Sequence, residues 1–286
     1  MSDASYISTR RIGDATITVI NEGVVRVPLT MVFREDAVAW LRAHGEATAD
    51  DCLTTCQAVV VIQLGDATVV IDPAFDDPGT AWDSHFATLW PSVRRTPGLQ
   101  VALASLGIAP ESVTHVAITH AHDDHFAGVL QGDTPRFPNA RHLLGQADWV
   151  GNPRHGQPEG DFAMRLGRID ALGLLDPVAG DHEIAPGIAM LHAPGETPGH
   201  AIVRIESGGQ TCYALGDLFH HACEVAHLAW SSPWVDPAAM TPSRHRLIAA
   251  AIARDASLVY THEPFAPWGR IVADGEGYRW VRDGDE

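Results

Sequence analysis

Three histidines and two aspartates crowd into six consecutive positions near the middle of this chain. The run is His120-Ala-His122-Asp-Asp124-His125. It follows the apolar segment 113–118, which is typical of a buried strand. Histidine is the commonest metal-binding side chain, and imidazoles that leave a strand end together can turn toward a single point. The run therefore predicts a site for a divalent transition metal.

Three more side chains of metal-binding type occur at the ends of predicted strands or turns. His200 follows Thr-Pro-Gly, Asp217 follows an apolar segment through a glycine, and His262 ends another apolar segment. A lone histidine in such a place is more often an ordinary surface residue, and chance clustering of solvated histidines is the alternative interpretation. Two adjacent divalent ions need carboxylates to offset their repulsion, and Asp124 and Asp217 supply them. The joint pattern favours two ions, with zinc expected and other divalent transition metals as open alternatives.

The elements that must position these residues are mainly strands. Hairpins are predicted within residues 15–27, 58–71 and 271–281, and helices within 35–44, 99–106, 161–172 and 241–255. Two strand-rich stretches, 15–145 and 174–281, follow one another without a linker. Two sheets packed face to face, with helices outside, satisfy this pattern. A single domain over residues 1–286 is therefore expected.

Composition and charge exclude several classes of protein. The chain has 286 residues, 45% of them hydrophobic, and a net charge of −17, which disfavours nucleic acid and anionic membranes as partners. No export signal or membrane span is visible, so a cytoplasmic location is expected. The four cysteines form no C-x-x-C pair and are expected to be buried free thiols. A disulfide between Cys52 and Cys56 is the alternative if their segment is helical.

At this point the chain resembles the metallo-β-lactamase superfamily, whose hallmark is H-x-H-x-D-H followed by a distant His, an Asp and a final His. The resemblance implies an α+β protein with a four-layer αββα sandwich. It also implies two zinc ions and their ligands: His120, His122 and His200 for one ion, Asp124, His125 and His262 for the other, and Asp217 bridging both. Asp72, at the end of an early predicted strand, would then support the ligands rather than bind metal.

Shorter stretches refine the resemblance. Residues 137–140, 147–149 and 185–187 are similar to the branch of the superfamily that includes methyl parathion hydrolase-like and lactonase-like enzymes. Ala121 stands where the diiron flavoproteins carry Glu, so iron-based oxygen or nitric oxide reduction is not expected. Leu218-Phe-His-His221 follows the bridging aspartate where quorum-signal lactonases commonly carry Tyr, which weakens a lactone-specific assignment. The resemblance also suggests a homodimer.

The resemblance implies a lactonase, arylesterase or phosphotriesterase-like hydrolase acting on a small, neutral, partly apolar substrate. A metal-bridging hydroxide would attack neutral esters, lactones or organophosphate triesters without any protein nucleophile. Asp124 is the candidate catalytic residue, because it could move a proton to the leaving group. Candidate pocket residues, for which core packing or solvent exposure is the alternative, are Phe33, Trp90, Trp149, Phe219, His220 and Trp268.

Two other functions stay open. A thioesterase of the glyoxalase II kind would want basic residues for the carboxylate of glutathione, and the candidates are Arg94, Arg95, Arg154 and Arg165. A non-catalytic metal-binding sensor module would keep the ligands but block the position of the attacking water. Turnover of substrate by metal-loaded protein separates these functions.

Overall fold

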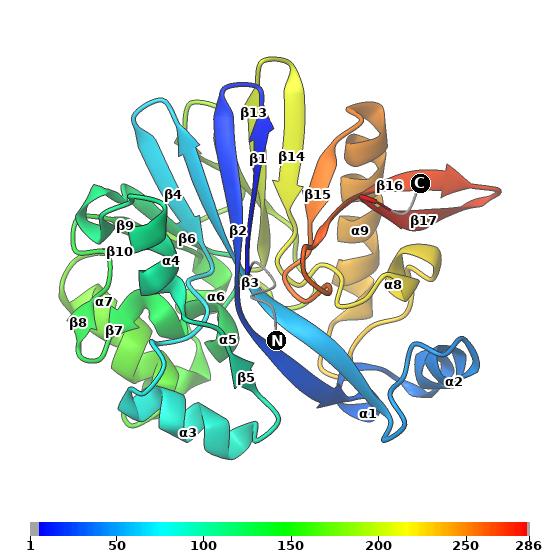
Figure 1. Ribbon diagram of the computed structural model, residues 1–286, viewed down its shortest axis with the longest axis horizontal. Helices are drawn as coiled ribbons and strands as arrows, with labels where there is room; N and C mark the ends of the chain where they lie inside the picture. Colours follow the sequence, from blue (N-terminus) through cyan, green and yellow to red (C-terminus); the bar gives the residue numbers. More distant parts are fainter. Residues whose placement is uncertain (1–5, 285–286) are drawn as a thin grey trace.

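The computed structural model describes residues 6–284, which form two large sheets packed face to face (Figure 1). The first sheet has the order β1-β2-β3-β4-β6-β9-β10, and β5 also pairs with β2. Its strands are β1 (Ile7–Ile12), β2 (Ala15–Pro28), β3 (Cys52–Leu64), β4 (Ala67–Ile71), β5 (Arg94–Arg95), β6 (His115–Ile118), β9 (Arg141–Gly145) and β10 (Leu175–Val178).

The second sheet runs in chain order from β11 to β17. Its strands are β11 (His182–Ala185), β12 (Ile188–His192), β13 (Ala201–Ser207), β14 (Gln210–Ala214), β15 (Ser257–Val259), β16 (Trp268–Asp274) and β17 (Gly277–Arg282). The short strands β7 (Leu130–Gln131) and β8 (Thr134–Pro135) form a separate ribbon. This second sheet is built almost entirely from the later half of the chain.

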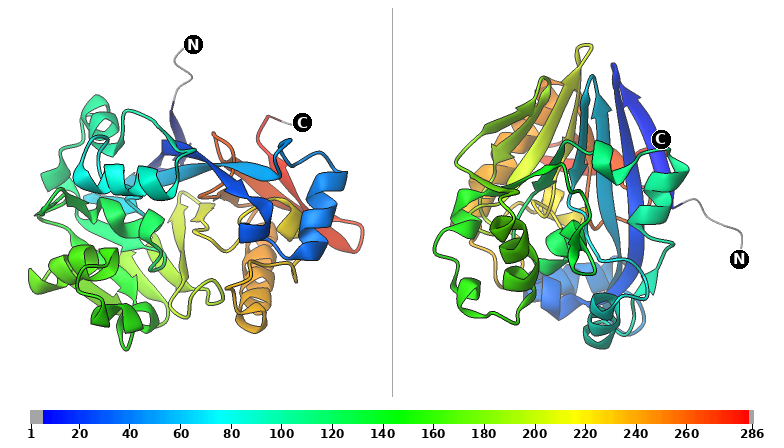
Figure 2. Two further views of the ribbon diagram at one scale, coloured as in Figure 1. Left: turned by 90° about the horizontal axis from the view of Figure 1, so that it is seen from below. Right: turned by 90° about the vertical axis from the view of Figure 1, so that its left-hand side faces the viewer.

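Helices cover the outer faces of both sheets, as the two views of Figure 2 show. The helices are α1 (Leu29–Val32), α2 (Glu35–Ala43), α3 (Ala81–Leu89), α4 (Leu99–Ser105), α5 (Asp123–Phe126), α6 (Gln146–Trp149), α7 (Gly167–Ala171), α8 (Cys223–Ala226) and α9 (Pro237–Ala253). Single helical turns of other types occur at Pro110–Ser112, Ala127–Val129, Pro153–Gly156 and Phe162–Leu166. Apolar residues of α3, α4 and α7 pack on the first sheet, and those of α9 pack on the second.

Side chains along each strand point alternately to the two faces of its sheet, so each sheet contributes to two layers of the core. In β3, Val59 and Val61 belong to the core under the helices, whereas Val60 and Ile62 belong to the core between the sheets. Successive side chains of a strand point to opposite faces, so a strand buried on both faces reads as a continuous apolar run. The predicted α+β class and four-layer αββα sandwich are therefore confirmed.

Parallel strand pairs bring the metal-binding residues to one edge. β4, β6 and β9 run parallel in the first sheet, and β14 and β15 run parallel in the second. The carboxyl ends of parallel neighbours lie at the same edge of a sheet. Asp72, His120, Asp217 and His262 all follow such strand ends, so the fold gathers side chains that are far apart in sequence.

One local prediction was wrong, and one alternative does not apply. The segment 15–27 is one continuous strand rather than a hairpin, because both of its halves pair with β3 and the ladder absorbs the intervening residues as a shift of register between Asn21 and Val24. Residues 52–56 are extended rather than helical, which separates the Cα atoms of Cys52 and Cys56 by about 13 Å. All four cysteines are free, as expected, but Cys52 is only partly buried, whereas the other three are buried.

Candidate metal centre

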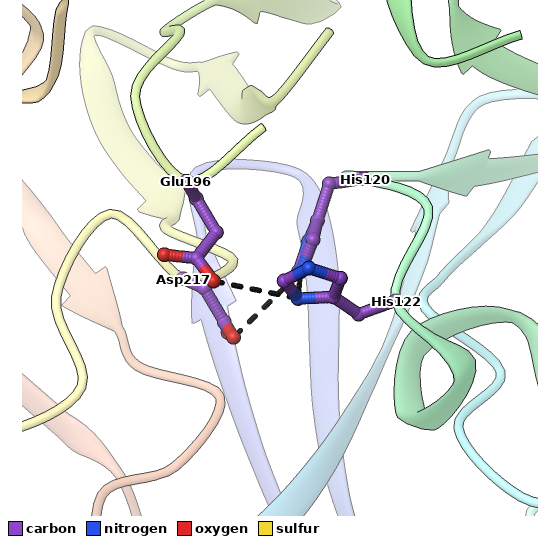
Figure 3. A group of neighbouring side chains, drawn as sticks. All are labelled: His120, His122, Glu196 and Asp217. Atoms are coloured by element: carbon purple, nitrogen blue, oxygen red, sulfur yellow. Dashed lines mark hydrogen bonds and ion pairs between the residues drawn. The ribbon is translucent and has the colours of Figure 1, made fainter. Parts of the chain in front are cut away.

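Two groups of metal-binding atoms lie side by side at this edge. Within each group, the candidate ligand atoms all lie within 4.8 Å of one another. The first group is His120, His122, Glu196 and Asp217 (Figure 3), and the second is Asp124, His125 and His262. Asp217 joins the groups, because its Oδ2 lies 3.7 Å from His120 Nε2 and its Oδ1 lies 3.3 Å from His125 Nε2. We call these seven residues the metal centre.

Asp72 orients the histidine run from behind. It follows β4 with a positive φ of 47°, and its carboxylate accepts hydrogen bonds from the backbone N–H and the hydroxyl of Thr119, both at 2.7 Å. The same carboxylate lies 2.9 Å from His125 Nδ1. A histidine that donates one ring N–H to a carboxylate presents its other nitrogen as a ligand. Asp72 therefore turns Nε2 of His125 toward the metal centre.

Asp148, which sequence reasoning missed, joins the loop that carries His120 and His122 to the loop that carries Glu196. Its Oδ2 accepts from the backbone N–H of Ala121 at 3.0 Å and from the hydroxyl of Thr197 at 2.6 Å. Its Oδ1 accepts from the backbone N–H of Gly199 at 2.6 Å. A Cβ at position 199 would come 2.6 Å from the backbone nitrogen of Asp148, so this approach requires glycine.

His200 lies beside the first group but not within it. Its Nδ1 lies 2.9 Å from the carbonyl oxygen of Ala193, and its Nε2 accepts the backbone N–H of Asp217 at 3.1 Å. Six of the seven predicted ligands thus lie in the two groups, and His200 lies next to His120, with 5.3 Å between the ring centroids. Glu196, which was not predicted, also lies in the first group. In the sequence, Glu196 stands out only because it is an acidic residue in the turn-forming segment just before His200.

The atoms of the metal centre fit a divalent cation. Among the buried side-chain atoms that lack a hydrogen-bond partner within residues 6–284, three belong to the metal centre and one to its neighbour: His125 Nε2, Glu196 Oε2, Asp217 Oδ1 and, next to them, His220 Nε2. Burial opposes the charged form of His125, yet Asp217 and Asp124 raise its pKa well above the ordinary value. Burial likewise opposes the charged form of Asp217, yet His125 and His262 hold its pKa well below the ordinary value. Imidazole nitrogen and carboxylate oxygen are the donors that zinc takes.

A cavity of about 310 Å³ opens on the metal centre. Its metal-facing part includes His122, Asp124, Asp217, His220 and His262. Its remaining wall is largely apolar and includes Val25, Val27, Met31, Leu53, Phe75, Trp82, Phe86, Trp90 and Trp234. Such a combination of an apolar wall and a few convergent polar groups is typical of small-molecule sites.

Of the six predicted pocket residues, only Trp90 and His220 line this cavity. Phe33 packs against α1 and α2, and Trp149 stacks on Phe162. Phe219 stacks on Tyr260 in the core under α9, and Trp268 is buried between the sheets. These four aromatic side chains pack in the core because apolar contacts are available there, which was the alternative weighed for each of them.

The fold and this centre together define a class: an αββα sandwich with a histidine–carboxylate cluster at one edge of its sheets. The model of the metallo-beta-lactamase superfamily matches residues 56–262. This chain therefore belongs to the metallo-beta-lactamase superfamily.

Curated relatives are distant and cover part of the chain. A probable metallo-hydrolase of Mycobacterium tuberculosis is 25% identical over 194 residues, which cover 57% of this chain and 56% of the relative. An N-acyl homoserine lactonase of a Bacillus species is 27% identical over 105 residues, 37% of this chain and 38% of the relative. The chain thus matches little more than half the length of the first of these relatives. The family and these relatives support a metal-dependent hydrolase.

Solved structures share the fold over nearly the whole chain. The hydrolase AbOPH has a TM-score of 0.81 at 18% identity and covers 98% of both chains. A probable metal-dependent hydrolase from Staphylococcus aureus has a TM-score of 0.81 at 22% identity, covering 96% of this chain and 99% of its own. The dizinc quorum-quenching lactonase AidC has a TM-score of 0.78 at 18% identity and covers 99% of both. The expected likeness to the lactonase-like branch is confirmed at the level of the fold.

Within residues 6–284, no helix has the length and the apolar character needed to span a bilayer.

Proposed function

We propose that this protein is a dinuclear zinc hydrolase of neutral esters, lactones or organophosphate triesters that carry an apolar substituent. The observation that carries the proposal is that a histidine–carboxylate centre forms one end of a largely apolar cavity. Two divalent ions bound there would supply Lewis acidity, which activates water near neutral pH and polarises a carbonyl or phosphoryl oxygen. AidC, which shares the fold, is described in complex with the product N-hexanoyl-L-homoserine.

The residues of this chain would divide the work by position. The apolar wall at Trp90 and Trp234 would hold the substituent and exclude water. Asp124 is placed to hold a proton for the leaving group, because 34% of its side chain is exposed and it lines the cavity. Gln57 donates to the backbone oxygen of Asp124 at 2.6 Å, which holds the backbone of Asp124 at this position.

The structure disfavours the thioesterase alternative, because three of its four candidate arginines already have ion-pair partners and the fourth, Arg94, does not line the cavity. Arg95 pairs with Glu22 and Asp83, Arg165 pairs with Asp76, and Arg154 pairs with Asp123. An anion such as the carboxylate of glutathione would have to compete with these partners. A lining with few free cations instead favours a neutral substrate.

A substrate panel tests the proposal. The zinc-loaded protein is assayed with p-nitrophenyl esters, acyl-homoserine lactones of increasing chain length, paraoxon-type triesters and S-lactoylglutathione, with and without a chelator. We expect turnover of at least one neutral class, loss of that turnover with chelator, and recovery when metal is restored. Turnover of S-lactoylglutathione alone would favour the thioesterase, and metal binding without turnover of any class would favour the sensor module.

A further inference from the structure

We propose that Glu196 is itself a metal ligand, whose carboxylate binds the ion held by His120 and His122. This inference rests on the metal centre of the proposed function and adds to it a third carboxylate beside Asp124 and Asp217. Neither the histidine run nor the implied ligand assignment contains this residue.

Glu196 lies in the loop between β12 and β13, directly after Gly195. Gly195 has a φ of 146°, and a Cβ there would come 2.4 Å from the Cα of Met240 in α9. Only glycine lets the loop pass this close to the helix. The close approach carries the next residue into the interior, where the side chain of Glu196 is fully buried.

The carboxylate of Glu196 points at the imidazoles of the first group (Figure 3). Its Oε1 lies 3.3 Å from His122 Nδ1, and His122 Nδ1 lies 2.9 Å from His120 Nε2. Two ligands of a tetrahedral zinc ion, each 2.0–2.1 Å from it, are roughly 3.3 Å apart. The spacing between Glu196 and His122 is therefore the spacing of two ligands of one ion.

The remaining contacts of Glu196 hold its carboxylate in place, and its ion-pair partners within residues 6–284 are both histidines, His122 and His220. Trp234 donates its indole N–H to Oε1 at 2.6 Å. Oε2 has no hydrogen-bond partner within the described chain, and its neighbour at 3.6 Å is His220 Nε2. Nearby Glu224, in contrast, pairs with the guanidinium of Arg244 at 2.6 Å. A buried carboxylate without a permanent cation is unfavourable, and a divalent ion at the first group would supply the missing charge.

A third carboxylate changes which ion the centre prefers. Carboxylate oxygen suits harder ions such as Mn²⁺ better than imidazole does, whereas imidazole suits zinc. The added negative charge also offsets more of the repulsion between two divalent ions. We therefore infer that Glu196 shifts the selectivity of this centre toward Mn²⁺ relative to a centre with histidines in its place.

Glu196→Gln tests the inference, because it keeps the shape of the side chain and removes the charge. The matched control is Asp123→Asn, which removes one charge next to the ligand Asp124 but breaks only a half-exposed pair with Arg154. Each protein is equilibrated with zinc, manganese or cobalt buffers. Metal content, affinity, and the visible spectrum of the cobalt form are measured.

We expect Glu196→Gln to bind one of the two ions at least about tenfold more weakly, as loss of a ligand should weaken binding at least as much as loss of a ligand's supporting partner. We also expect altered cobalt bands and a smaller ratio of manganese to zinc affinity. Asp123→Asn should stay within about twofold of the parent, since exposed pairs contribute little. Trp234→Phe, which keeps the carboxylate but removes its indole donor, should shift the cobalt bands without loss of an ion.

Unchanged affinity and cobalt bands in Glu196→Gln, or equal changes in Asp123→Asn, would overturn the inference. If Glu196→Gln does not fold, the cobalt bands of Trp234→Phe decide, and bands identical to those of the parent count against a ligand role. If the parent shows chelator-sensitive turnover but Glu196→Gln binds metal as tightly as the parent, this inference alone is overturned. A parent that takes up no metal would sink the proposed function as well.

Discussion

Two clusters of buried charged residues lie in this protein, and they balance their charge differently. In the first, Arg136 lies 2.9 Å from Asp77, Arg165 lies 3.1 Å from Asp76, and Arg95 lies 3.2 Å from Glu22. We call these six residues the arginine cluster. In the metal centre, by contrast, the ion-pair partners of Asp217 and Glu196 within residues 6–284 are all histidines.

The difference shows which cluster is structural and which is built for an outside cation. A buried carboxylate is tolerated when a charged, hydrogen-bonded partner accompanies it. Guanidinium groups are always charged, so the arginine cluster has its balancing cations within the chain. Imidazoles are charged only when protonated, so the metal centre depends on protons or metal ions. The predictions below test this contrast, from the largest expected effect to the smallest.

The largest effect is expected from Asp217→Asn, because Asp217 contacts both groups of ligand atoms. Loss of its charge should release at least one ion and lower kcat/KM by about a thousandfold or more, which exceeds the 10–100-fold range of supporting residues. Metal analysis and kinetics of the purified variant measure both. Full metal content together with near-parental kcat/KM would show that Asp217 does not bridge the groups.

Arg136→Met should damage stability rather than metal binding. Arg136 is almost fully buried, donates to the carbonyl oxygen of Gly128 at 2.7 Å, and pairs with Asp77. Removing one partner of a buried pair costs about 3–5 kcal/mol of unfolding free energy. Denaturant unfolding with saturating zinc gives that difference, and metal content should stay at the parental value. A variant that loses metal at unchanged stability would contradict the contrast between the clusters.

Asp72→Asn should have an intermediate effect on the metal centre. The carboxylate of Asp72 accepts from His125 Nδ1, and an amide in its place orients that ring less firmly. Loss of such a supporting partner lowers metal affinity by about 10–100-fold. Competition with a chromophoric chelator measures the affinity, and an unchanged value would indicate that Thr119 and the backbone orient the run without Asp72.

The smallest effect, counted per pH unit, is expected in the pH dependence of stability. Burial raises the pKa of Glu22 to about 7, against the lowering effect of Arg95 and Arg136. Between its unfolded value of 4.5 and about 7, the folded protein holds this proton more tightly than the unfolded chain does. Stability should therefore fall as pH rises through this range, by up to about 1.4 kcal/mol per pH unit. Denaturant unfolding of Glu22→Gln should show a smaller fall, and an identical pH profile would contradict this assignment.

The sequence predicted the parts of the site that depend on local order. The histidine run and Asp72 follow strands directly, so their position at a sheet edge was readable from apolar segments and spacing. Glu196 and Asp148 act through contacts between separate loops, which spacing in one segment does not reveal. The same limit explains the aromatic residues, because Trp90 and Trp268 look alike in sequence, while one lines the cavity and the other is buried between the sheets.

The strand boundaries were predicted less well where pairing with a neighbouring strand decides whether a segment turns or continues. Asn-Glu-Gly after Ile20 favours a turn locally, yet the chain continues as β2, because β3 is long enough to pair with residues on both sides of the shift in register. Tertiary pairing thus outweighed local turn preference. The arginine cluster was not predicted at all, since its members come from positions 22 to 165.

The central claim, that the metal centre takes its missing positive charge from divalent ions, is tested most directly by the metal content of the purified protein. The protein is prepared without added metal or chelator and analysed by inductively coupled plasma mass spectrometry, then again after equilibration with zinc. The account predicts bound transition metal in the first sample and about two equivalents per chain in the second. A protein without metal in both samples would contradict it.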